Sequence, residues 1–459
     1  MLTYQLKKAP GVPLYEALYR NIRADILGGV LVPGQKLPSK RALAANLEVS
    51  KITVEAAYDQ LVAEGYICAK EKVGYFVEAV EHRAQKQQQP QTPQEKKDTC
   101  AIDLTQNACM DFPFSVWSSL QRGVMREHKE KLLQSVENQG LWSLRSAIAA
   151  HLRDFRGMHV SPENILVGAG TDFLYNLLIQ LLGRDLVYAV EEPGYNKIRK
   201  IYDAGGVQCI SAPLDSQGVI PDALDRAQVL HLSPAHHFPT GIITPMPRRA
   251  ELLQWAQEKT VRFLIEDDYD SEFRFNAHPM PTLFSMDRAG RVIYMNTFSK
   301  TLAPSIRISY MVLPDPLMAH FRQKLGFYSC TVPSFEQYTL ERFLREGHFE
   351  KHINRMRKAY KTRRNRVLEV LRSCPFGDKF TVLEQDAGLH FLLQVDTDLS
   401  DAELVKRCLQ KGIRVQSLSS YYHDQKQDRH CLVINYSGVS DTQLQLLEQI
   451  LRAIYQEAT

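Results

Sequence analysis

The sequence predicts a winged helix-turn-helix unit followed by a large α/β domain, in which a mainly parallel sheet carries helices on both faces. Three observations support this prediction. Two short helical patterns joined by a tight turn precede a β-prone hairpin near the start of the chain. A stretch rich in Gln, Lys and Pro then interrupts the chain, and apolar β-type runs alternate with helical stretches beyond it. At 459 residues, the chain is too long for one ordinary domain.

Composition narrows the class of protein. A hydrophobic content of 44% and a charged content of 24% are typical of soluble globular proteins. No apolar run approaches the roughly 20 residues of a membrane span, and the start "MLTYQLKKAP" lacks the apolar stretch of a signal peptide, so we expect a cytoplasmic protein. The eight cysteines form no C-x-x-C pair, which argues against a disulfide framework and a zinc site. A net charge of +4 is too small to indicate a nucleic-acid partner by itself.

The first predicted domain covers residues 11–80. Leu14, Leu18, Ile22 and Ile26 recur every four residues, which predicts one apolar helix face ending at the following glycine pair. Ser39 is the expected N-cap of a second helix, and Ser50 that of a third. The segment "YICAKEKVGYFVE" then reads as a hairpin, the usual wing of such a unit.

A recognition helix needs small or polar residues in its first turn to enter the major groove, while nearby cations hold phosphates. The predicted helix starts and the hairpin tip supply both kinds of residue. The alternative is that these are ordinary solvated helix faces, but caps, spacing, hairpin and charge all agree with DNA binding. The predicted DNA-binding residues are Ser39, Lys40, Arg41, Ser50, Lys51, Thr53, Lys70 and Lys72.

This region resembles the winged helix-turn-helix of GntR-type bacterial regulators over its full extent. The signature "PG-x-x-LPS-x-R-x-LA" lies between Pro33 and Ala44. The resemblance implies that the domain binds operator DNA as a dimer. The wing departs from the pattern, since "EKVGYFV" stands where a glycine-serine-glycine tip is common, which puts contacts through Val73 in doubt.

Residues 81–101 read as a solvated linker, because they contain almost no residue that could enter a core. The second domain, residues 102–459, holds the β-type runs "ILVGAG", "LVYAVEEPGY", "QVLHLSP", "RFLIEDDY", "RVIYMNTFSK" and "RISYMVL". Each run ends in polar or glycine residues. Ligands of parallel α/β sheets bind at the carboxyl ends of the strands, so we expect these residues to converge on one site.

Lys300 follows one of these strands, with Thr297 and Ser299 before it and Arg307 beyond it. A lysine becomes nucleophilic when a hydrophobic or cationic setting lowers its pKa. Such a lysine can form a Schiff base with an aldehyde cofactor, and the neighbouring hydroxyls and guanidinium can hold that cofactor's phosphate. The segment therefore favours a pyridoxal 5'-phosphate (PLP) site.

Other strand ends supply the remaining parts of a PLP site. Gly170 and Thr171 open a helix whose backbone N–H groups can cradle a phosphate. Asp267 can accept a hydrogen bond from the pyridine nitrogen, Tyr269 can reach the ring hydroxyl, and Tyr195 can stack on the ring face. Taken alone, each of these segments has a more common structural explanation. The glycine-rich segment is more often a tight turn, Arg307 more often part of a surface ion pair, and the acidic segment more often a solvated strand end. The set in this order, with Lys300 about 33 residues after Asp267, favours the cofactor.

Residues 102–459 resemble a fold-type I aminotransferase with a small C-terminal α+β domain, and its fusion to a GntR-type head marks the MocR subfamily of transcriptional regulators. The segments "SPAHHFPTG", "IEDDYDSEFRF" and "TFSKTLAP-x-x-R" carry this resemblance. It implies a head-to-tail homodimer without significant turnover, in which PLP responds to a small effector. By position it implies Lys300 as the cofactor lysine, Asp267 and Tyr269 as ring partners, and a phosphate group of Gly170, Thr171, Thr297, Ser299 and Arg307.

Several residues depart from the family pattern. Val433 occupies the place of the arginine that holds a substrate α-carboxylate in aminotransferases, and Arg414 or Arg429 are the possible substitutes. A tyrosine expected near Ser135 for the partner subunit's phosphate is missing, and Asp172 stands where a glutamine is frequent. We therefore hypothesise that PLP itself is the signal, as in PdxR-like members, with an amine lacking an α-carboxylate as the alternative. Two other readings are a working aminotransferase with a DNA-binding head and a dimerisation scaffold with an empty pocket.

Overall fold

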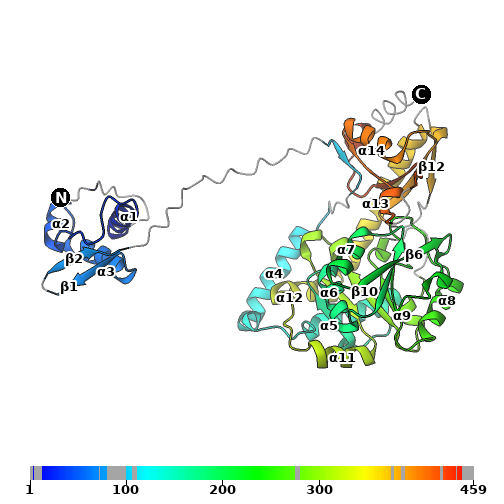
Figure 1. Cartoon of the computed structure of the whole chain (residues 1–459), viewed down its shortest axis with the longest axis horizontal. Coiled ribbons are helices and arrows are strands. Elements are labelled where there is room, and N and C mark those ends of the chain that lie inside the picture. The colour runs from blue at the N-terminus through cyan, green and yellow to red at the C-terminus, as the bar shows by residue number, and fades with distance from the viewer. Residues whose placement is uncertain are drawn as a thin grey trace. The chain divides into compact units, whose positions relative to one another are not determined.

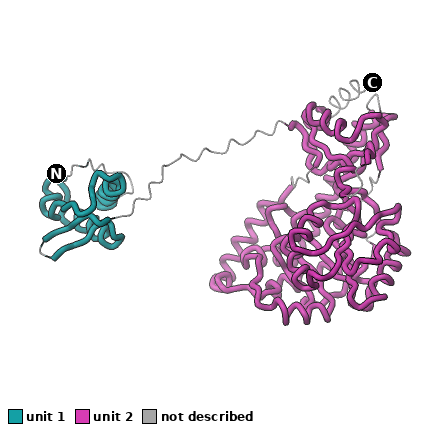
Figure 2. Tube along the Cα trace, viewed as in Figure 1, with its two compact units in different colours: residues 1–97 teal, residues 98–459 magenta. Residues whose placement is uncertain are grey.

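The computed structural model describes residues 4, 13–71, 73–79, 100–105, 111–273, 280–373, 377–383, 388–423, 427–440 and 442–446. The chain divides into two compact units, residues 1–97 and residues 98–459 (Figure 2). We refer to them as the head and the effector domain. Residues 81–99 of the predicted linker lie outside the described residues.

The head consists of three helices and a two-stranded hairpin. The side chain of Ser39 accepts a hydrogen bond from the backbone N–H of Ala42, and that of Ser50 accepts one from the backbone N–H of Thr53. The two predicted N-caps are therefore formed. The elements are α1 Leu14–Leu27, α2 Lys40–Asn46, α3 Lys51–Ala63, β1 Ile67–Lys70 and β2 Gly74–Val77.

The core of the head lies between α1 and α3. Leu18, Ile22 and Ile26 are buried on α1, as their four-residue spacing predicts, and they pack in one cluster with Val54 and Tyr58 of α3. The strands β1 and β2 pair in antiparallel fashion, which forms the predicted wing. The fold of this unit thus follows from caps and spacing that are visible locally.

The effector domain is built around a sheet of eight strands in the order β4-β11-β10-β9-β8-β5-β6-β7 (Figure 1). The pairs β10–β9, β9–β8, β8–β5 and β5–β6 are parallel, whereas β11 runs antiparallel to both of its neighbours. The predicted mainly parallel sheet is confirmed. The strands are β4 Ile165–Gly168, β5 Val187–Glu192, β6 Gln208–Asp215, β7 Gly218–Val219, β8 Val229–Leu232, β9 Phe263–Asp267, β10 Val292–Thr297 and β11 Ser309–Val312.

Helices cover both faces of this sheet. Val229 and Ile265 pack in one cluster with α6 and α11, whereas their neighbours Leu230 and Leu264 pack in another with α8. Apolar strands buried on both faces are the reason that the strand sequences read as continuous apolar runs. The helices are α4 Phe114–His128, α5 Trp142–Arg156, α6 Thr171–Leu182, α7 Asn196–Ala204, α8 Met246–Gln257, α9 Leu283–Met286, α10 Phe298–Thr301, α11 Asp315–Leu325, α12 Ser334–Arg345 and α13 His348–Ser373.

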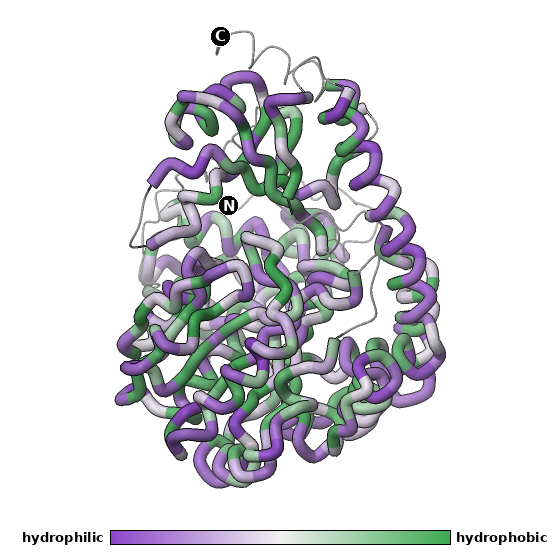
Figure 3. Tube along the Cα trace, turned by 90° about the vertical axis from the view of Figure 1, so that its right-hand side faces the viewer, coloured by the Kyte–Doolittle hydropathy of each residue, from purple (hydrophilic) through white to green (hydrophobic). Residues whose placement is uncertain are grey.

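A smaller C-terminal part follows α13. Its antiparallel sheet has the order β12-β13-β16-β15, and a short parallel pair joins β14 to β3 from the start of the effector domain. Hydrophobic residues concentrate on the interior strands, while the helices around them alternate hydrophobic and hydrophilic residues (Figure 3). The elements are β3 Ile102–Asp103, β12 Phe380–Leu383, β13 His390–Val395, α14 Asp401–Gln410, β14 Ile413–Arg414, β15 Gln416–Ser417 and β16 Cys431–Asn435.

The parallel strands place their carboxyl ends at one edge of the large sheet. β4, β5, β9 and β10 end just before the segments that hold Thr171, Tyr195, Tyr269 and Lys300. The antiparallel strand β11 begins at this same edge, just after Arg307. Within the described part of the chain, no helix has the length and apolar character needed to cross a membrane.

Candidate functional site

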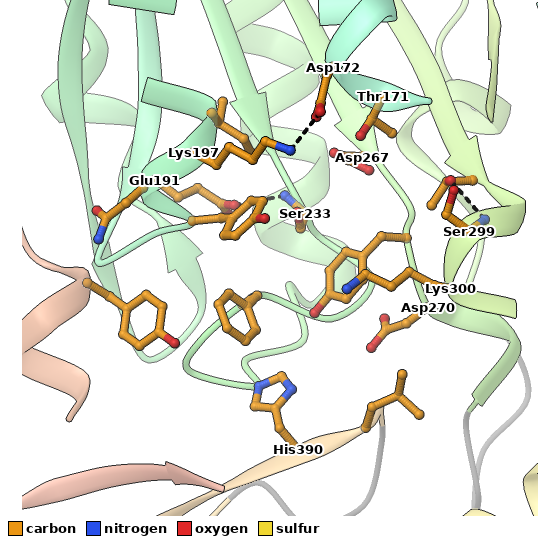
Figure 4. A pocket seen from close by; sticks show the side chains of 18 of the residues that line it. Thr171, Asp172, Glu191, Lys197, Ser233, Asp267, Asp270, Ser299, Lys300 and His390 are labelled. Atoms are coloured by element: carbon orange, nitrogen blue, oxygen red, sulfur yellow. Dashed lines mark hydrogen bonds and ion pairs between the residues drawn. The ribbon is translucent and has the colours of Figure 1, made fainter. Parts of the chain in front are cut away.

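A pocket of about 600 Å³ lies at this edge of the sheet, with the C-terminal part as its other wall (Figure 4). The structure brings together eight of the nine residues that the sequence predicts for the cofactor. Gly170, the ninth, immediately precedes α6 and does not itself line the pocket. The lining residues among those predicted are Lys300, Asp267, Tyr269, Tyr195, Thr171, Thr297, Ser299 and Arg307.

Asp267, at the end of β9, is held by two residues that the sequence analysis missed. Tyr175 on α6 donates a hydrogen bond to its Oδ2 atom, and Nε2 of His231 on β8 lies 3.4 Å from the same oxygen. The Oδ1 atom is buried and has no hydrogen-bond partner. One carboxylate oxygen is thus fixed, and the other is left to accept a hydrogen bond. His231 was detectable as a polar residue within an apolar strand, but Tyr175 carries no comparable signal.

Lys300 follows β10 and lies on α10. Its side chain is accessible from the pocket, yet protein atoms surround it (Figure 4). This enclosure lowers the pKa of the Lys300 ammonium, although the nearby Asp270 and Asp267 act in the opposite direction. A lowered pKa increases the fraction of neutral amine, which is the nucleophilic form.

Ser299 and Arg307 lie at another end of the pocket, beside the N-terminus of α6. The side chain of Thr297 accepts hydrogen bonds from the backbone N–H of Ser299 and the hydroxyl of Ser309, while Oγ of Ser299 is buried without a partner. Gly170 has a φ of +89°, and a Cβ atom there would lie 2.2 Å from the Arg307 guanidinium. Glycine therefore leaves room for this guanidinium beside the helix N-terminus. The N–H of Gly170 donates to the carbonyl of Gly168 instead of facing a ligand, unlike the sequence prediction. The N–H groups of the first turn of α6, a hydroxyl and a cation together form an anion site.

Asp172 links two cations near this anion site. Its Oδ2 atom lies 2.6 Å from Nζ of Lys197 and 3.5 Å from the Arg307 guanidinium. The side chains of all three residues are between 37% and 48% exposed, so solvent weakens these ion pairs. Asp172 stands at a position where related proteins frequently carry a glutamine. Its carboxylate thus keeps both cations close to the N-terminus of α6.

Two further carboxyl groups line the pocket. Asp270 lies 2.8 Å from Nδ1 of His236, beside Tyr269. Burial raises the pKa of Glu191 to about 8, although the backbone N–H of Ser233 donates a hydrogen bond to it. Glu191 is therefore mostly protonated at neutral pH, and it adds little negative charge to the pocket.

Val433 lies behind the wall that the C-terminal part contributes, and it does not itself line the pocket. This residue is buried on β16 in a cluster with Leu392, Tyr421 and Cys431, against which Phe238 packs. Two members of its surroundings, Tyr421 and Phe238, do line the pocket, as does Asn435, two residues along the same face of β16.

The two arginines considered as substitutes for a carboxylate-binding residue do not line this pocket. Arg414 lies 3.4 Å from Asp103, and the guanidinium of Arg429 lies 5.0 Å from the ring centre of Tyr422. The described residues therefore place no arginine beside Val433 to receive an α-carboxylate.

The unsatisfied atoms of the pocket match the functional groups of PLP. This cofactor carries a ring nitrogen that donates when protonated, an aldehyde that reacts with a neutral amine, and a phosphate. Oδ1 of Asp267, the amine of Lys300 and Oγ of Ser299 are the corresponding groups of the protein. Unsatisfied buried polar atoms are uncommon in folded proteins. Their presence at two positions of the pocket therefore fits a bound PLP.

The head carries its predicted DNA-binding residues at the starts of α2 and α3. Ser39, Arg41, Ser50 and Lys51 are exposed there, and Thr53 is partly exposed. Lys40 is different, because its side chain is 17% exposed and lies 2.9 Å from Glu55 and 3.2 Å from Asp59. The charge of Lys40 is thus compensated within the head. The sequence had suggested instead that this ammonium is free to contact a DNA phosphate.

The wing carries the other two predicted DNA-binding residues. Lys70 is exposed at the end of β1, where it pairs with Gly74 across the hairpin. Its ammonium lies 4.8 Å from the ring centre of Phe76. Lys72 lies outside the described residues. Lys70 thus sits beside the tip of the wing, where its charge remains open to solvent.

Comparisons with known proteins agree with both parts of the structure. Residues 14–77 match the family of bacterial regulatory proteins of the gntR type, and residues 100–451 match the class I and II aminotransferases. The chain is 35% identical to the uncharacterized HTH-type transcriptional regulator YdeL of Bacillus subtilis, over 96% of this chain and 97% of that protein. It is 32% identical to the pyridoxine biosynthesis regulator PdxR of Corynebacterium glutamicum, over 88% of each chain.

Other comparisons extend this likeness. The chain is 30% identical to the probable rhizopine catabolism regulatory protein MocR of Rhizobium meliloti, over 95% of this chain and 92% of that protein. Among solved structures, the kynurenine aminotransferase of Pyrococcus horikoshii aligns with 78% of this chain and 91% of its own, at a TM-score of 0.67 and 25% identity. The chain therefore belongs to the MocR subfamily of HTH-type transcriptional regulators, in which a GntR-type DNA-binding head precedes a PLP-binding domain of the aminotransferase fold.

Proposed function

We propose that the effector domain holds PLP through Lys300, Asp267 and the anion site, and that Tyr269 and Tyr195 contact the ring. When bound, PLP supplies an aldehyde that condenses with primary amines. The enclosure of Lys300 keeps its amine available for that aldehyde. Tyr175 and His231 hold Asp267 so that its second oxygen faces the ring nitrogen. Thr171, Thr297, Ser299 and Arg307 hold the phosphate, and Gly170 leaves the room that Arg307 needs.

We propose further that PLP itself is the signal and that the head binds operator DNA in response to it. The observation that carries this proposal is that Val433, at the position where aminotransferases hold a carboxylate, lies in an apolar cluster and that neither Arg414 nor Arg429 lines the pocket. A carboxylate buried there would lack a bidentate partner, at a cost of several kcal/mol. The likeness to a pyridoxine biosynthesis regulator supports a role in controlling vitamin B6 metabolism.

The test is a titration of the PLP-loaded protein with a panel of common α-amino acids and with amines that lack a carboxylate. Absorption of the cofactor and binding of operator DNA are measured in the same samples. Under the proposal, addition of PLP to the cofactor-free protein changes DNA binding, and millimolar α-amino acids change neither readout. An α-amino acid that shifts both readouts would refute PLP as the signal.

The fold retains the groups that aminotransferases use, so turnover requires its own test. We propose that this domain senses without significant turnover, because the wall around Val433 does not fix an amino-acid substrate in one orientation. The experiment is a search for keto-acid products over many hours with paired amino and keto acids. Val433→Arg serves as the comparison, since it returns the cation that the family carries at this position. Repeated turnover by the parent protein would favour the aminotransferase reading.

We also propose that the protein acts as a homodimer in the cytoplasm. Leu133 and Phe327 are 82% and 77% exposed, which is unusual for large apolar side chains. Their segments lie near each other, because Asn138 donates a hydrogen bond to the carbonyl of Gly326. A second copy that covers this surface would bury both side chains. Sedimentation of the parent protein and of the variant L133E/F327E tests whether this surface is the dimer interface. The expected result is a dimer for the parent and a monomer for the variant.

A further inference from the structure

Helix α13, the longest helix of the effector domain, carries much more positive charge than the chain as a whole. Nine of its residues are Lys or Arg and two are Glu, which is a net charge of +7 against +4 for the whole protein. Its apolar residues, such as Phe349, Met356 and Val367, are buried in the main cluster. Charge and core thus occupy opposite sides of one helix.

Some of these cations have structural roles. Arg357 donates to the carbonyl of Glu272, Arg363 to that of Ser437, and Arg364 is buried beside Asn365. Lys351, Lys358 and Lys361 differ from them, because they are exposed and no ion pair joins them to a carboxylate in the described part of the chain. Their charge is therefore open to an outside partner.

The three lysines lie on one face, since residues three, four or seven apart project from the same side of a helix. At 1.5 Å per residue, they span about 15 Å along the axis. We call this exposed surface the α13 face. Its members are Lys351, Asn354, Arg355, Lys358, Lys361, Thr362, Asn365, Arg366, Glu369 and Arg372.

We propose that the α13 face binds the phosphate backbone of DNA that flanks the site read by the head. The face is cationic and polar throughout, with Glu369 as its one acid. It has no exposed apolar residue, whereas an amphipathic membrane helix or the core of a protein interface needs them. The covalent connection to a DNA-binding head also raises the local concentration of DNA around the effector domain.

The contact is electrostatic and independent of sequence, because ammonium groups that hold phosphates do not read bases. It goes beyond the regulator's operator recognition and depends on the head only for bringing DNA close. Duplexes of two lengths separate the contribution of the head to DNA affinity from that of the α13 face. The head reads about 20 bp as a dimer, so a duplex of that length reports on the head and a longer one reports on both surfaces.

The experiment uses the full-length protein and the variant K351Q/K358Q/K361Q. A short duplex is selected from a random pool as the tightest ligand, and a long one extends it by about 20 bp of random sequence on each side. Affinity is measured over a range of salt concentrations. The matched control K259Q/K324Q/K406Q removes three exposed lysines from other elements.

On the long duplex, the α13 variant is expected to reduce the slope of log affinity against log salt by about 0.9 for each lost contact, or about 2.7 for each α13 face that contacts the DNA. Its slope on the short duplex and both slopes of the control should equal those of the parent. An unchanged slope on the long duplex would overturn the proposal, as would an equal fall on both lengths. If the head itself did not bind DNA, Arg41→Ala would leave the affinity for the short duplex unchanged, whereas a failure of the α13 proposal alone would leave that effect of Arg41→Ala intact.

Discussion

Lys40 in the head and Lys300 in the effector domain each lie close to two carboxylates, yet their pKa values shift in opposite directions. Partial burial acts to lower the pKa of Lys40, but hydrogen bonds to Tyr75, Glu55 and Asp59 outweigh it and raise that pKa. Around Lys300, the surrounding protein atoms displace water from the ammonium, and this desolvation outweighs the attraction of Asp270 and Asp267 and lowers the pKa.

The difference lies in what else the carboxylates bind. Glu55 and Asp59 point at Lys40 directly. Asp270 is instead paired with His236, and Asp267 with Tyr175 and His231, so neither is fully available to Lys300. The pKa of the same side chain is thus raised in one unit, where direct hydrogen bonds outweigh desolvation, and lowered in the other, where desolvation outweighs the attraction of the carboxylates.

The largest effect is expected from Lys300→Ala, which removes the one lysine that the structure sets up as a nucleophile in the pocket. The visible absorption band of the lysine-bound cofactor should disappear completely. Lys197→Ala is the matched control, because Lys197 also lines the pocket but is paired with Asp172. If the Lys300 variant kept the band, or the Lys197 control lost it, Lys300 would not be the lysine that binds the cofactor.

Asp267→Asn should weaken PLP binding by roughly 1.5–3 kcal/mol, about ten- to hundredfold, because a neutral amide no longer favours the protonated ring nitrogen. Tyr175→Phe leaves the carboxylate but removes a group that orients it, so a smaller loss of about 0.5–1.5 kcal/mol is expected. Equilibrium titration with PLP measures both. If Asp267→Asn bound PLP as tightly as the parent protein, a group other than Asp267 would have to accept the hydrogen bond from the ring nitrogen.

In the head, Arg41→Ala and Lys51→Ala should each reduce operator affinity roughly tenfold at 0.1 M salt and lower the salt slope by about one unit for each contact removed. Lys40→Ala should change the affinity much less, because Lys40 is already paired with Glu55 and Asp59. Its main effect should be a loss of up to about 1 kcal/mol of unfolding free energy. Cofactor absorption serves as the control, since all three changes lie outside the effector domain. A larger affinity loss for Lys40 than for Lys51 would contradict this assignment.

The smallest effect is expected from Glu191→Gln. Because the pKa of Glu191 is raised to about 8, the folded protein keeps a proton that the unfolded chain has lost above its ordinary pKa of 4.5. This carboxyl therefore lowers stability as pH rises from about 4.5 to 8. The variant should bind PLP like the parent at pH 7, and its melting temperature should rise relative to that of the parent between pH 5 and pH 8. A difference that does not vary with pH would mean that Glu191 is not protonated.

Local signals were sufficient for the head and for the outline of the pocket. Ser39 and Ser50 cap helices through residues only three positions away, and the buried face of α1 repeats every four residues. Lys300 and Asp267 could be placed together because neighbouring parallel strands end at the same edge. In each case, spacing along the chain determines the geometry, and the spacing is visible in the sequence.

Only the tertiary structure decided which of these groups are satisfied. Tyr175 reaches Asp267 across 92 positions of the chain, and Lys40 meets Asp59 across 19. Val433 acquires its apolar neighbours from β13 and from the loop that contains Phe238. Such contacts depend on the path of the whole backbone, for which no local pattern exists. The sequence by itself therefore determined the residue types and the edge at which they meet, whereas packing decided which charges are paired and which atoms stay open to a ligand.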